Sequence, residues 1–435
     1  MITMKCKNVK NMKYYILSIT FFILFFNAPV AFSLTIEDAL KMAQEYYPVL
    51  QSRIKMSNQA KDLYISSYDP FFPVISVGYN YRNAFDTTLH NITYNKIWDV
   101  QYSAYVGASY RLFDGGFRWS RAKEAYYAYK QTINDIDITE NELAYQVKQA
   151  FYTAMAGERI YIVAKESEAT AQRNYDLALA RRQEGIANLS DVTQAQVRLT
   201  QSKMDTVSAQ KDMEKAFSNL NSLIGLPLNN TYELEEEFQT ELVEGAVDEL
   251  QSEALKRRAE IDKQLNELGF VKQTIKEQKS NFLPKVDFQI YYNWYDSDSH
   301  LDEHEAALSV GATFNLFDGL GRFYRVTAQK EALYASQKNL LEAKRSINLE
   351  VNNAYKDIER SYANYQTALN LVKEGQVNYD QAFNEYKVGK GDIISLLQAE
   401  INLARSRITL IQQKMNYNIA VSSLEKALGK DIYNN

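Results

Sequence analysis

Hydrophobic and polar residues alternate with a period of two in four segments of the chain. One face of each segment is apolar, with Trp or Tyr near its ends, and the other face is polar or small. This alternation predicts β-strands. The four segments are 75–82, 98–112, 286–295 and 306–316. They predict two strand hairpins, at 74–113 and 285–317.

Most of the remaining chain shows a helical pattern. No proline falls within 117–180 or 321–386, so both stretches can form long, uninterrupted helices. Apolar residues also recur at alternating spacings of four and three, which indicates heptad seams between packed helices. The seam positions are Val351, Tyr355, Ile358, Tyr362, Tyr365, Leu369 and Val372, and then Leu397, Ile401, Ala404, Ile408, Ile411 and Met415.

The two halves of the chain are related by a tandem duplication. Leu-Phe-Asp-Gly occurs at 112–115 and again at 316–319, an offset of 204 residues. The same offset relates the segments that begin "NYDLALARRQEG" at Asn174 and "NYDQAFNEYKVG" at Asn378. An offset conserved over this length indicates duplication. The predicted repeats span 34–225 and 247–430. A linker or small side segment at 226–246 joins them, and a short tail at 431–435 follows.

Turn residues mark both ends of each hairpin and the far end of each helical pair. Prolines precede the hairpins, and Asp-Gly pairs end them in sharp strand-to-helix exits, because Asp caps helices and Gly accepts positive φ. We expect bulky β-branched replacements of the exit glycines to impair assembly. Glycine-marked tips are predicted near 185–191 and 389–395, about 100 Å along an unbroken helix. The strand-start residues are Pro73 and Pro284, and the exit residues are Asp114, Gly115, Asp318 and Gly319.

The strand pattern suits a membrane barrel or a soluble sandwich. The strand lengths fit tilted transmembrane strands, and the terminal aromatic residues fit headgroup belts, which favours the barrel. Four strands cannot close a barrel, and an open edge in lipid leaves backbone groups unpaired. Several chains must therefore share the barrel. Two copies would give eight strands and three copies would give 12, and the pattern alone does not choose.

The N-terminus predicts export. Lysines precede a short apolar run at 14–26, and Ala31-Phe32-Ser33 fits a cleavage site, so residues 1–33 are expected to be a signal peptide. No later apolar run is long enough for a transmembrane helix. The only cysteine, Cys6, lies within the signal. The mature chain is therefore expected to have no disulfide, no Cys metal site and no lipid anchor.

Composition and motifs argue against several functional classes. The net charge of −5 argues against a nucleic-acid partner. The sequence shows no catalytic triad and no phosphate-binding loop, so neither an enzyme nor a bound cofactor is predicted. His300 and His304 lie in an acidic segment that could hold a metal. Since nothing fixes a ligand geometry there, we interpret this segment as a polar surface loop and predict no metal site.

The combined layout resembles a known family. The duplicated exits, the Phe-Leu-Pro at 282–284, and the Tyr-Lys-Val-Gly at 386–389 with its following Leu-Leu-Gln-Ala are similar to TolC-type outer-membrane efflux proteins, also called outer membrane factors. The resemblance covers essentially the whole mature chain. It implies a mixed α/β membrane protein that forms a homotrimer. Three β-hairpin pairs would share a 12-stranded β-barrel, and long antiparallel coiled-coil helices would form an α-helical periplasmic tunnel.

The resemblance also implies a function. The chain would be a passive channel in the outer membrane of a Gram-negative envelope, with a long periplasmic extension, serving a tripartite efflux or type I secretion system. Its partners would be outer-membrane lipid, a periplasmic adaptor (membrane fusion protein) and an inner-membrane RND, ABC or MFS pump. The alternative is a structural or adhesive envelope protein that uses the coiled coil as a spacer and conducts nothing. The second hairpin favours the channel, since a spacer does not need it.

For the tips, the resemblance implies adaptor contact and closure of the duct. The candidates are Gly185, Ser190, Asp191, Tyr386, Gly389, Lys390, Gly391 and Asp392. Tyr386 and Asp191 fall where the family places closing contacts. The chain departs from relatives at three positions. Gly391 stands where well-studied relatives have an Arg, and Ser395 and Gln398 stand where some relatives have aspartates. Three interpretations remain open. Lys390 and Asp392 form the electrostatic latch that closes the duct in place of those residues, or the duct is held shut more weakly, or Lys390 and Asp392 are merely solvated turn residues. We expect Lys390 to pair with an acid such as Asp191 on a neighbouring hairpin.

Overall fold

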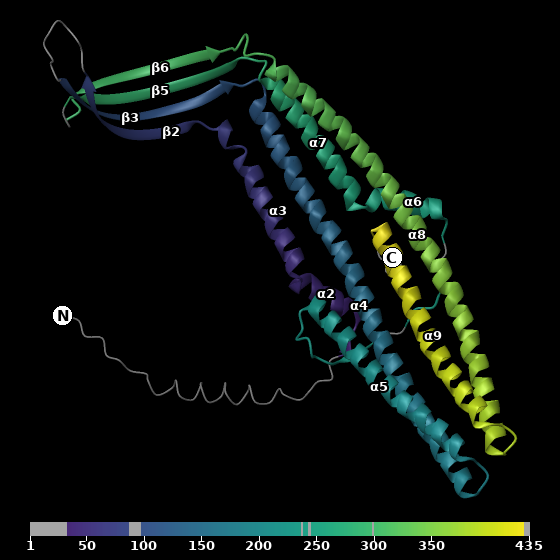
Figure 1. Cartoon of the computed structure of the whole chain (residues 1–435). Helices are drawn as coiled ribbons and strands as arrows, with labels where there is room; N and C mark the ends of the chain where they lie inside the picture. Colours follow the sequence, from purple (N-terminus) through teal and green to yellow (C-terminus); the bar gives the residue numbers. More distant parts are fainter. Residues whose placement is uncertain (1–32, 87–96, 236–237, 242–244, 298–299, 430–435) are drawn as a thin grey trace, which may run out of the picture. The chain divides into compact units, whose positions relative to one another are not determined.

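The computed structural model describes residues 33–86, 97–235, 238–241, 245–297 and 300–429 (Figure 1). All of the expected signal peptide except Ser33, and the expected tail, lie outside these residues. The chain divides into two compact units. The strand unit contains Gln44–Gln146, Glu241–Gln366 and Asn416–Asn435, and the tip unit contains Met1–Ala43, Val147–Thr240 and Thr367–Met415. Each unit draws on both halves of the duplicated sequence, so the sequence repeats and the spatial units divide the chain differently.

The strand unit contains a four-stranded antiparallel sheet (Figure 1). Its strands are β2 (Val74–Asp86), β3 (Ile97–Phe113), β5 (Lys285–Asp296) and β6 (Glu303–Thr313), in the order β2-β3-β5-β6. Each repeat contributes one hairpin, and β3 pairs with β5, with Tyr110 opposite Phe288. Among the residues that the structure describes, no strand of the same chain therefore lies along the outer edge of β2 or of β6.

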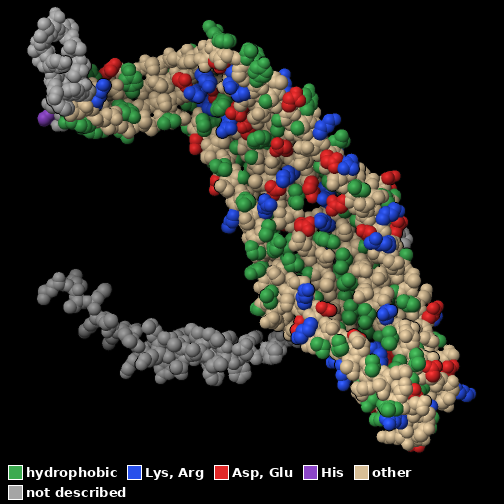
Figure 2. Space-filling view, viewed as in Figure 1, with side chains coloured by type: hydrophobic (Ala, Val, Ile, Leu, Met, Phe, Trp, Pro, Cys, Tyr) green, Lys and Arg blue, Asp and Glu red, His purple; other side chains and the backbone are tan. Residues whose placement is uncertain are grey.

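The apolar face of the sheet is exposed in a single chain. Val77 is 82% exposed, Ile75 is 76% exposed and Leu308 is 64% exposed. Exposed apolar patches of this kind mark surfaces that contact membrane or protein partners. Charged side chains instead gather where the strands meet the helices (Figure 2).

The second hairpin ends earlier than the alternation predicts. The apolar pattern continues to Leu316, but β6 ends at Thr313. Among the described strands, β6 pairs with β5 alone, and β5 begins at Lys285 opposite Thr313. In a single chain, no described strand consequently lies beside Phe314 and Leu316. Both side chains are exposed.

Four long helices connect to the strands of the sheet. α3 (Pro48–Ser66) and the short 3-10 helix η2 (Asp69–Phe71) lead into β2, and α7 (Ala259–Ser280) leads into β5. α4 (Phe117–Gln183) follows β3, and α8 (Gly321–Lys387) follows β6. The core of the strand unit packs α6 (Val247–Arg257), α7 and α8 against the end of α9 (Ile393–Leu428). Its fully buried members include Ala254, Val351, Ile358, Tyr417 and Leu424.

The tip unit contains the turns between the long helices. α4 turns back into α5 (Leu189–Ile224), and α8 turns back into α9. Side chains from both turns share one core, which includes Ala178, Val192, Tyr386 and Leu396. In the same unit, β1 (Ser33–Leu34) pairs in parallel with β4 (Glu233–Leu234), and α2 (Ile36–Tyr46) begins directly after β1.

The buried stripe of α9 differs from the predicted heptad seam. Leu396 and Leu403 are buried, whereas Ile401, Ala404 and Ile408 are half-buried. α9 is apolar on more than one face, so spacing alone does not identify the face that packs. Among the helices that the structure describes, none combines the length and apolar character needed to cross a membrane.

Candidate functional site

The strand exits have the backbone conformation that the sequence analysis expects. Gly115 has a φ of 67° and Gly319 has a φ of 85°. At the first exit, Asp114 accepts hydrogen bonds from the backbone N–H groups of Gly116 at 3.0 Å and Arg118 at 3.1 Å. Asp114 therefore caps the start of α4.

An arginine ties each exit to the segment that precedes the same hairpin. Arg118 Nε lies 2.8 Å from Asp114, its Nη1 donates to the Pro70 carbonyl at 2.9 Å, and its guanidinium lies 5.1 Å from the Phe71 ring. The second repeat reproduces these contacts. Arg322 Nε lies 2.8 Å from Asp318, its Nη1 donates to the Asn281 carbonyl at 2.9 Å, and it lies 5.1 Å from the Phe282 ring. Pro73 and Pro284 directly precede β2 and β5.

Sequence reasoning missed these two arginines as site residues. Arg118 and Arg322 are 204 residues apart, which is the offset of the duplication. The recurrence of an arginine at this offset is the sequence signal that could have identified both residues. Since each arginine bridges an exit to a carbonyl and a ring, we assign both to the positioning of the hairpins.

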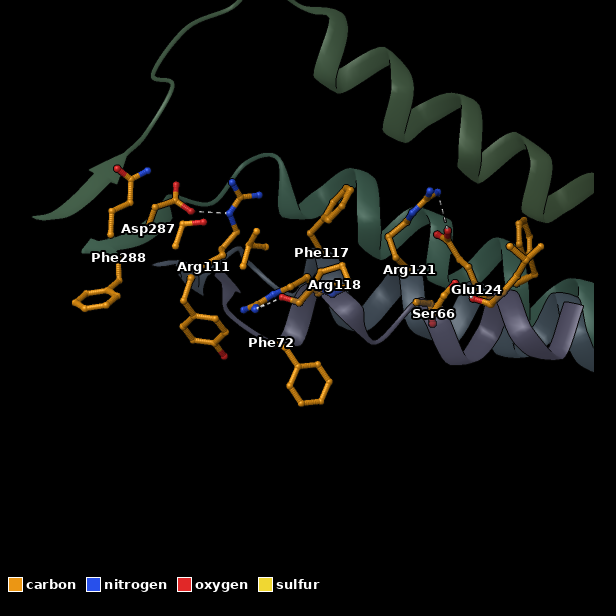
Figure 3. A pocket seen from close by; sticks show the side chains of 18 residues that line it. Ser66, Phe72, Arg111, Phe117, Arg118, Arg121, Glu124, Asp287 and Phe288 are labelled. Carbon is orange, nitrogen blue, oxygen red and sulfur yellow. Dashed lines mark hydrogen bonds and ion pairs between the residues drawn. The ribbon is translucent and has the colours of Figure 1, made fainter. Parts of the chain in front are cut away.

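A cavity of 890 Å³ lies beside the first exit (Figure 3). Residues from α3, β2, β3, α4, α7 and β5 line it, and its apolar lining includes Phe72, Phe117 and Phe288. Its arginines have partners, since Arg111 pairs with Asp287 at 2.8 Å and Arg118 pairs with Asp114. Its lining also includes Leu63 and Ser66 of α3, both of which are exposed. We call it the exit cavity.

Glu124 is a buried acid in the lining of the exit cavity. Its side chain is 6% exposed, and it lies 3.6 Å from Arg121, which also lies 3.9 Å from Glu277. Burial, followed by a hydrogen bond with Glu277, raises the pKa of Glu124 to about 7. Glu124 therefore remains partly protonated near neutral pH.

The two tips have the same backbone fold. Gly185 has a φ of 76° and Gly389 has a φ of 81°. The N–H of Ile186 donates to the Arg181 carbonyl at 2.9 Å, and the N–H of Lys390 donates to the Glu385 carbonyl at 2.9 Å. These bonds lie 204 residues apart, so the duplication extends to the tips.

The acidic tip candidates have local partners. Asp191 accepts a hydrogen bond from the Asn188 N–H at 3.3 Å at the start of α5, where Ser190 is exposed. Asp392 accepts bonds from the backbone N–H of Ser395 at 2.9 Å and from its hydroxyl at 2.7 Å, and these bonds hold the pKa of Asp392 below its usual value. In the part of the chain that the structure describes, no carboxylate of the same chain forms an ion pair with Lys390.

Gly391 packs closely against the end of α8. A Cβ at this position would lie 3.1 Å from both the Cβ of Glu385 and the backbone N of Tyr386. Any residue with a side chain would require these neighbours to shift. The local packing therefore fits a glycine at this position.

Arg181 joins the first tip to the second, a contact that sequence reasoning missed. Its Nη1 donates to the Tyr386 carbonyl at 2.6 Å and the Lys387 carbonyl at 3.2 Å, and its guanidinium lies 4.7 Å from the Tyr386 ring. A cation at the C-terminus of α8 stabilises the carbonyl groups of its last turn. Tyr386 is 2% exposed, and burial raises its pKa.

A buried ion pair also connects the two helical hairpins. Arg198 of α5 donates to Glu400 of α9 at 3.0 Å, and Asn174 of α4 donates to the other Glu400 oxygen at 2.6 Å. Glu400 is 3% exposed. Burial raises the pKa of Glu400, and Arg198 opposes that shift.

The chemistry of these sites is structural. Over the described ranges, no group of three or more His, Cys, Asp or Glu side chains could hold a metal ion. His304 stacks on Tyr292 across the β5–β6 hairpin, with ring centroids 5.9 Å apart. The arginine contacts at the exits and at the tips hold neighbouring strands and helices together.

Comparisons with known proteins agree with this architecture. The family model described as "Outer membrane efflux protein" matches residues 39–226 and 250–430. The probable efflux pump outer membrane protein TtgC of Pseudomonas putida is 24% identical over 350 residues, which cover 77% of this chain and 70% of TtgC.

Solved structures share the fold at low sequence identity. The outer membrane protein VceC of Vibrio cholerae has a TM-score of 0.80 at 14% identity, with 91% of this chain and 96% of VceC covered. The outer membrane channel CmeC of Campylobacter jejuni has a TM-score of 0.80 at 15% identity, with 92% of this chain and 87% of CmeC covered.

Proposed function

The chain belongs to the outer membrane efflux protein family, and from this premise we propose that three copies form the exit duct of a tripartite efflux pump. Members of the family are outer-membrane channels, not enzymes. They extend into the periplasm and work with adaptors and inner-membrane pumps. The chain is accordingly an outer-membrane efflux channel with a periplasmic extension.

The observation that supports shared closure is the open sheet. Its order leaves β2 and β6 as free edges, and an unpaired strand edge in lipid costs several kcal/mol for each backbone group. Pairing β6 of one copy with β2 of the next removes every edge. Three copies of a four-stranded sheet form a barrel of 12 strands, the size that the family resemblance implies.

The tips are the proposed adaptor-docking surface. Four aliphatic side chains around the turns are exposed: Ile186 (64%), Leu189 (60%), Val388 (67%) and Ile394 (62%). Exposed apolar side chains at a helical turn suit a protein partner. We further propose that Lys390 pairs with Asp191 of a neighbouring hairpin when the duct is closed.

The latch proposal can be tested by conductance at low and high salt. One exposed ion pair contributes about 0–1 kcal/mol, so Lys390→Ala and Asp191→Ala should each raise the open fraction modestly at low salt, and less at high salt. Ser190→Ala is the matched control. If both variants behave like the parent at every salt concentration, the latch is wrong and the tips serve docking alone.

Mass measurement tests shared closure directly. In detergent, light scattering should give the mass of three chains. A monodisperse folded monomer would contradict the proposal, since its strand edges would be unmatched.

A further inference from the structure

A second pocket, of 400 Å³, lies at the first exit between α4 and α7. Further along, these two helices are joined by Lys263, which pairs with Asp135 at 2.7 Å, and by Gln131, which donates to Glu267 at 2.9 Å. The pocket is open beside Gly116, because no described atom would lie within 4 Å of a Cβ there. We call it the lysine pocket after three residues of its lining, which are Lys123 of α4 and Lys276 and Lys279 of α7.

The charges of these three lysines are not neutralised within the chain. All three side chains are exposed, and no carboxylate among the described residues forms an ion pair with any of them. The lining that the structure describes includes no Asp or Glu. Glu277, which follows Lys276 in the sequence, lies 3.9 Å from Arg121 of the exit cavity instead. The lysine pocket therefore has a net positive charge that suits an anion.

Two buried polar side chains add hydrogen-bond donors to the lining. Ser120 is 5% exposed and Gln273 is 8% exposed. Neither side chain forms a hydrogen bond with another described residue. Buried polar groups normally have a partner, so the hydroxyl and the amide are available to a molecule in the pocket. Together with the ammonium groups, they form a set of donors that suits phosphate oxygens.

The lysine pocket and the exit cavity lie on opposite sides of α4. Lys285 of the polar sheet face has its Nζ 6.0 Å from the centre of the Phe117 ring, and the polar-face pair Arg111–Asp287 lines the exit cavity. At 3.6 residues per turn, the α4 residues of the lysine pocket point away from Phe117 and Arg121. Those residues are Trp119, Ser120 and Lys123.

Trp119 connects the lysine pocket to the apolar face of the sheet. It is 59% exposed, and its ring centroid lies 4.8 Å from that of Phe71. The Arg118 guanidinium lies 5.1 Å from the Phe71 ring and 5.5 Å from the ring of Tyr110, a residue of the apolar face. Tryptophan is enriched at the boundary between membrane and water. The lysine pocket thus lies beside the face that contacts lipid, at the level where the strands end.

The lysines are not required by the geometry of an exit. The two exits share their glycine conformation and their arginine contacts, but the duplicated positions of the lysines are not basic. Exit positions recur after 204 residues, and strand-start positions recur after 211, as Pro73 and Pro284 show. At these offsets, the residues that correspond to the three lysines are Thr327, Ile65 and Tyr68.

We propose that the lysine pocket binds the phosphate group of an anionic phospholipid from the periplasmic leaflet of the outer membrane. This inference rests on the proposed barrel, because strands that cross the membrane place the first exit at the level of the headgroups. The ammonium groups, Ser120 and Gln273 donate to the phosphate oxygens, and Trp119 packs on the upper acyl chains. Three lysines exceed the charge of one phosphate, so an anionic headgroup is favoured over a zwitterionic one, which carries its own cation.

Quenching of Trp119 fluorescence by brominated phospholipids tests this site. Trp98→Phe and Trp294→Phe leave Trp119 as the only tryptophan of the chain. The protein is reconstituted into phosphatidylcholine vesicles that contain increasing fractions of phosphatidylglycerol or phosphatidylcholine, brominated near the top of the acyl chains. Brominated phosphatidylglycerol should bind beside Trp119 about fivefold more tightly or better, which is the effect expected for each basic residue near an anionic headgroup.

Substitution of the lysines should remove this preference. A variant with all three pocket lysines replaced by Gln should be quenched equally by both lipids. The matched control loses three exposed lysines elsewhere and should keep the preference, although its net charge changes equally. Its substitutions are Lys203→Gln, Lys338→Gln and Lys373→Gln. If the pocket variant does not assemble like the parent by light scattering, Lys123→Gln alone replaces it and should weaken the preference.

The outcomes separate this inference from the proposed function. Equal quenching of the parent by both lipids overturns the site and leaves the channel intact, and so does a preference that the pocket variant retains or that the control also loses. A preference abolished by inorganic phosphate, but not by sodium chloride of equal ionic strength, would assign the pocket to free phosphate and overturn the lipid. If neither lipid quenches Trp119, the first exit is not at the membrane boundary, and both the site and the proposed barrel are wrong.

Discussion

At the scale of single residues, two adjacent glycines separate backbone strain from close packing. Gly115 and Gly116 both have positive φ, 67° and 87°, but only Gly115 has neighbours where its Cβ would lie. Replacement by Ala should cost about 1–2 kcal/mol at either position from the left-handed backbone.

Gly115→Ala should cost more than Gly116→Ala, because its Cβ also meets Leu283. We expect a lower melting temperature for Gly115→Ala, measured by circular dichroism in detergent. Equal melting temperatures would show that Leu283 moves away without cost.

The Gly115→Val, Gly319→Val double variant should reduce the yield of assembled protein, and a normal yield would contradict a structural role for the exits.

Arg181 allows a similar comparison with its neighbour. It donates to two carbonyls at the end of α8, and bonds to charged groups contribute about 1.5–3 kcal/mol. Arg181→Ala should therefore increase amide hydrogen exchange at the second tip. Arg182→Ala, at an exposed position, is the control. Unchanged exchange at residues 384–392 in Arg181→Ala would rule out this role.

At the scale of elements, the stability contributed by the contact between α4 and α7 should depend on pH. The pKa of Glu124 is raised from an ordinary 4.5 to about 7, so the folded state binds more protons between these values. The resulting stabilisation is fully present below pH 4.5 and is lost as pH rises through 7. The melting temperature should consequently fall between pH 5 and pH 8.

Glu124→Gln should reduce this pH dependence, because Gln resembles the protonated acid and can still donate to Glu277. Glu158→Gln, elsewhere on α4, is the control and should leave the dependence intact. An identical fall in melting temperature for Glu124→Gln and the parent would show that another group is responsible.

The strands and exits are the elements that the sequence predicts best, because period-two alternation and Asp-Gly turns act locally. The predicted end of the second hairpin was wrong, because Phe314 and Leu316 continue the alternating pattern without a described strand beside them. The packed face of α9 was ambiguous because apolar residues occur on several faces of that helix. Arg181 could not be found, since its partner Tyr386 comes close only through folding, and the duplication relates Arg181 to Glu385 instead.

At the scale of the whole molecule, duplication explains how one chain supplies two equivalent walls. Each repeat contributes a hairpin, an exit arginine and a helical tip with matching contacts. Three such chains would surround an axis with six similar units, which suits a duct. A spacer would require the helices alone.

Single-channel recording tests the central claim most directly. The purified protein should insert into a planar lipid bilayer and give discrete conductance steps, because a closed 12-stranded barrel over a helical tunnel encloses a water-filled path. Protein that is trimeric by light scattering and inserts into the bilayer, yet gives no conductance steps, would contradict the account and leave a structural envelope protein in its place.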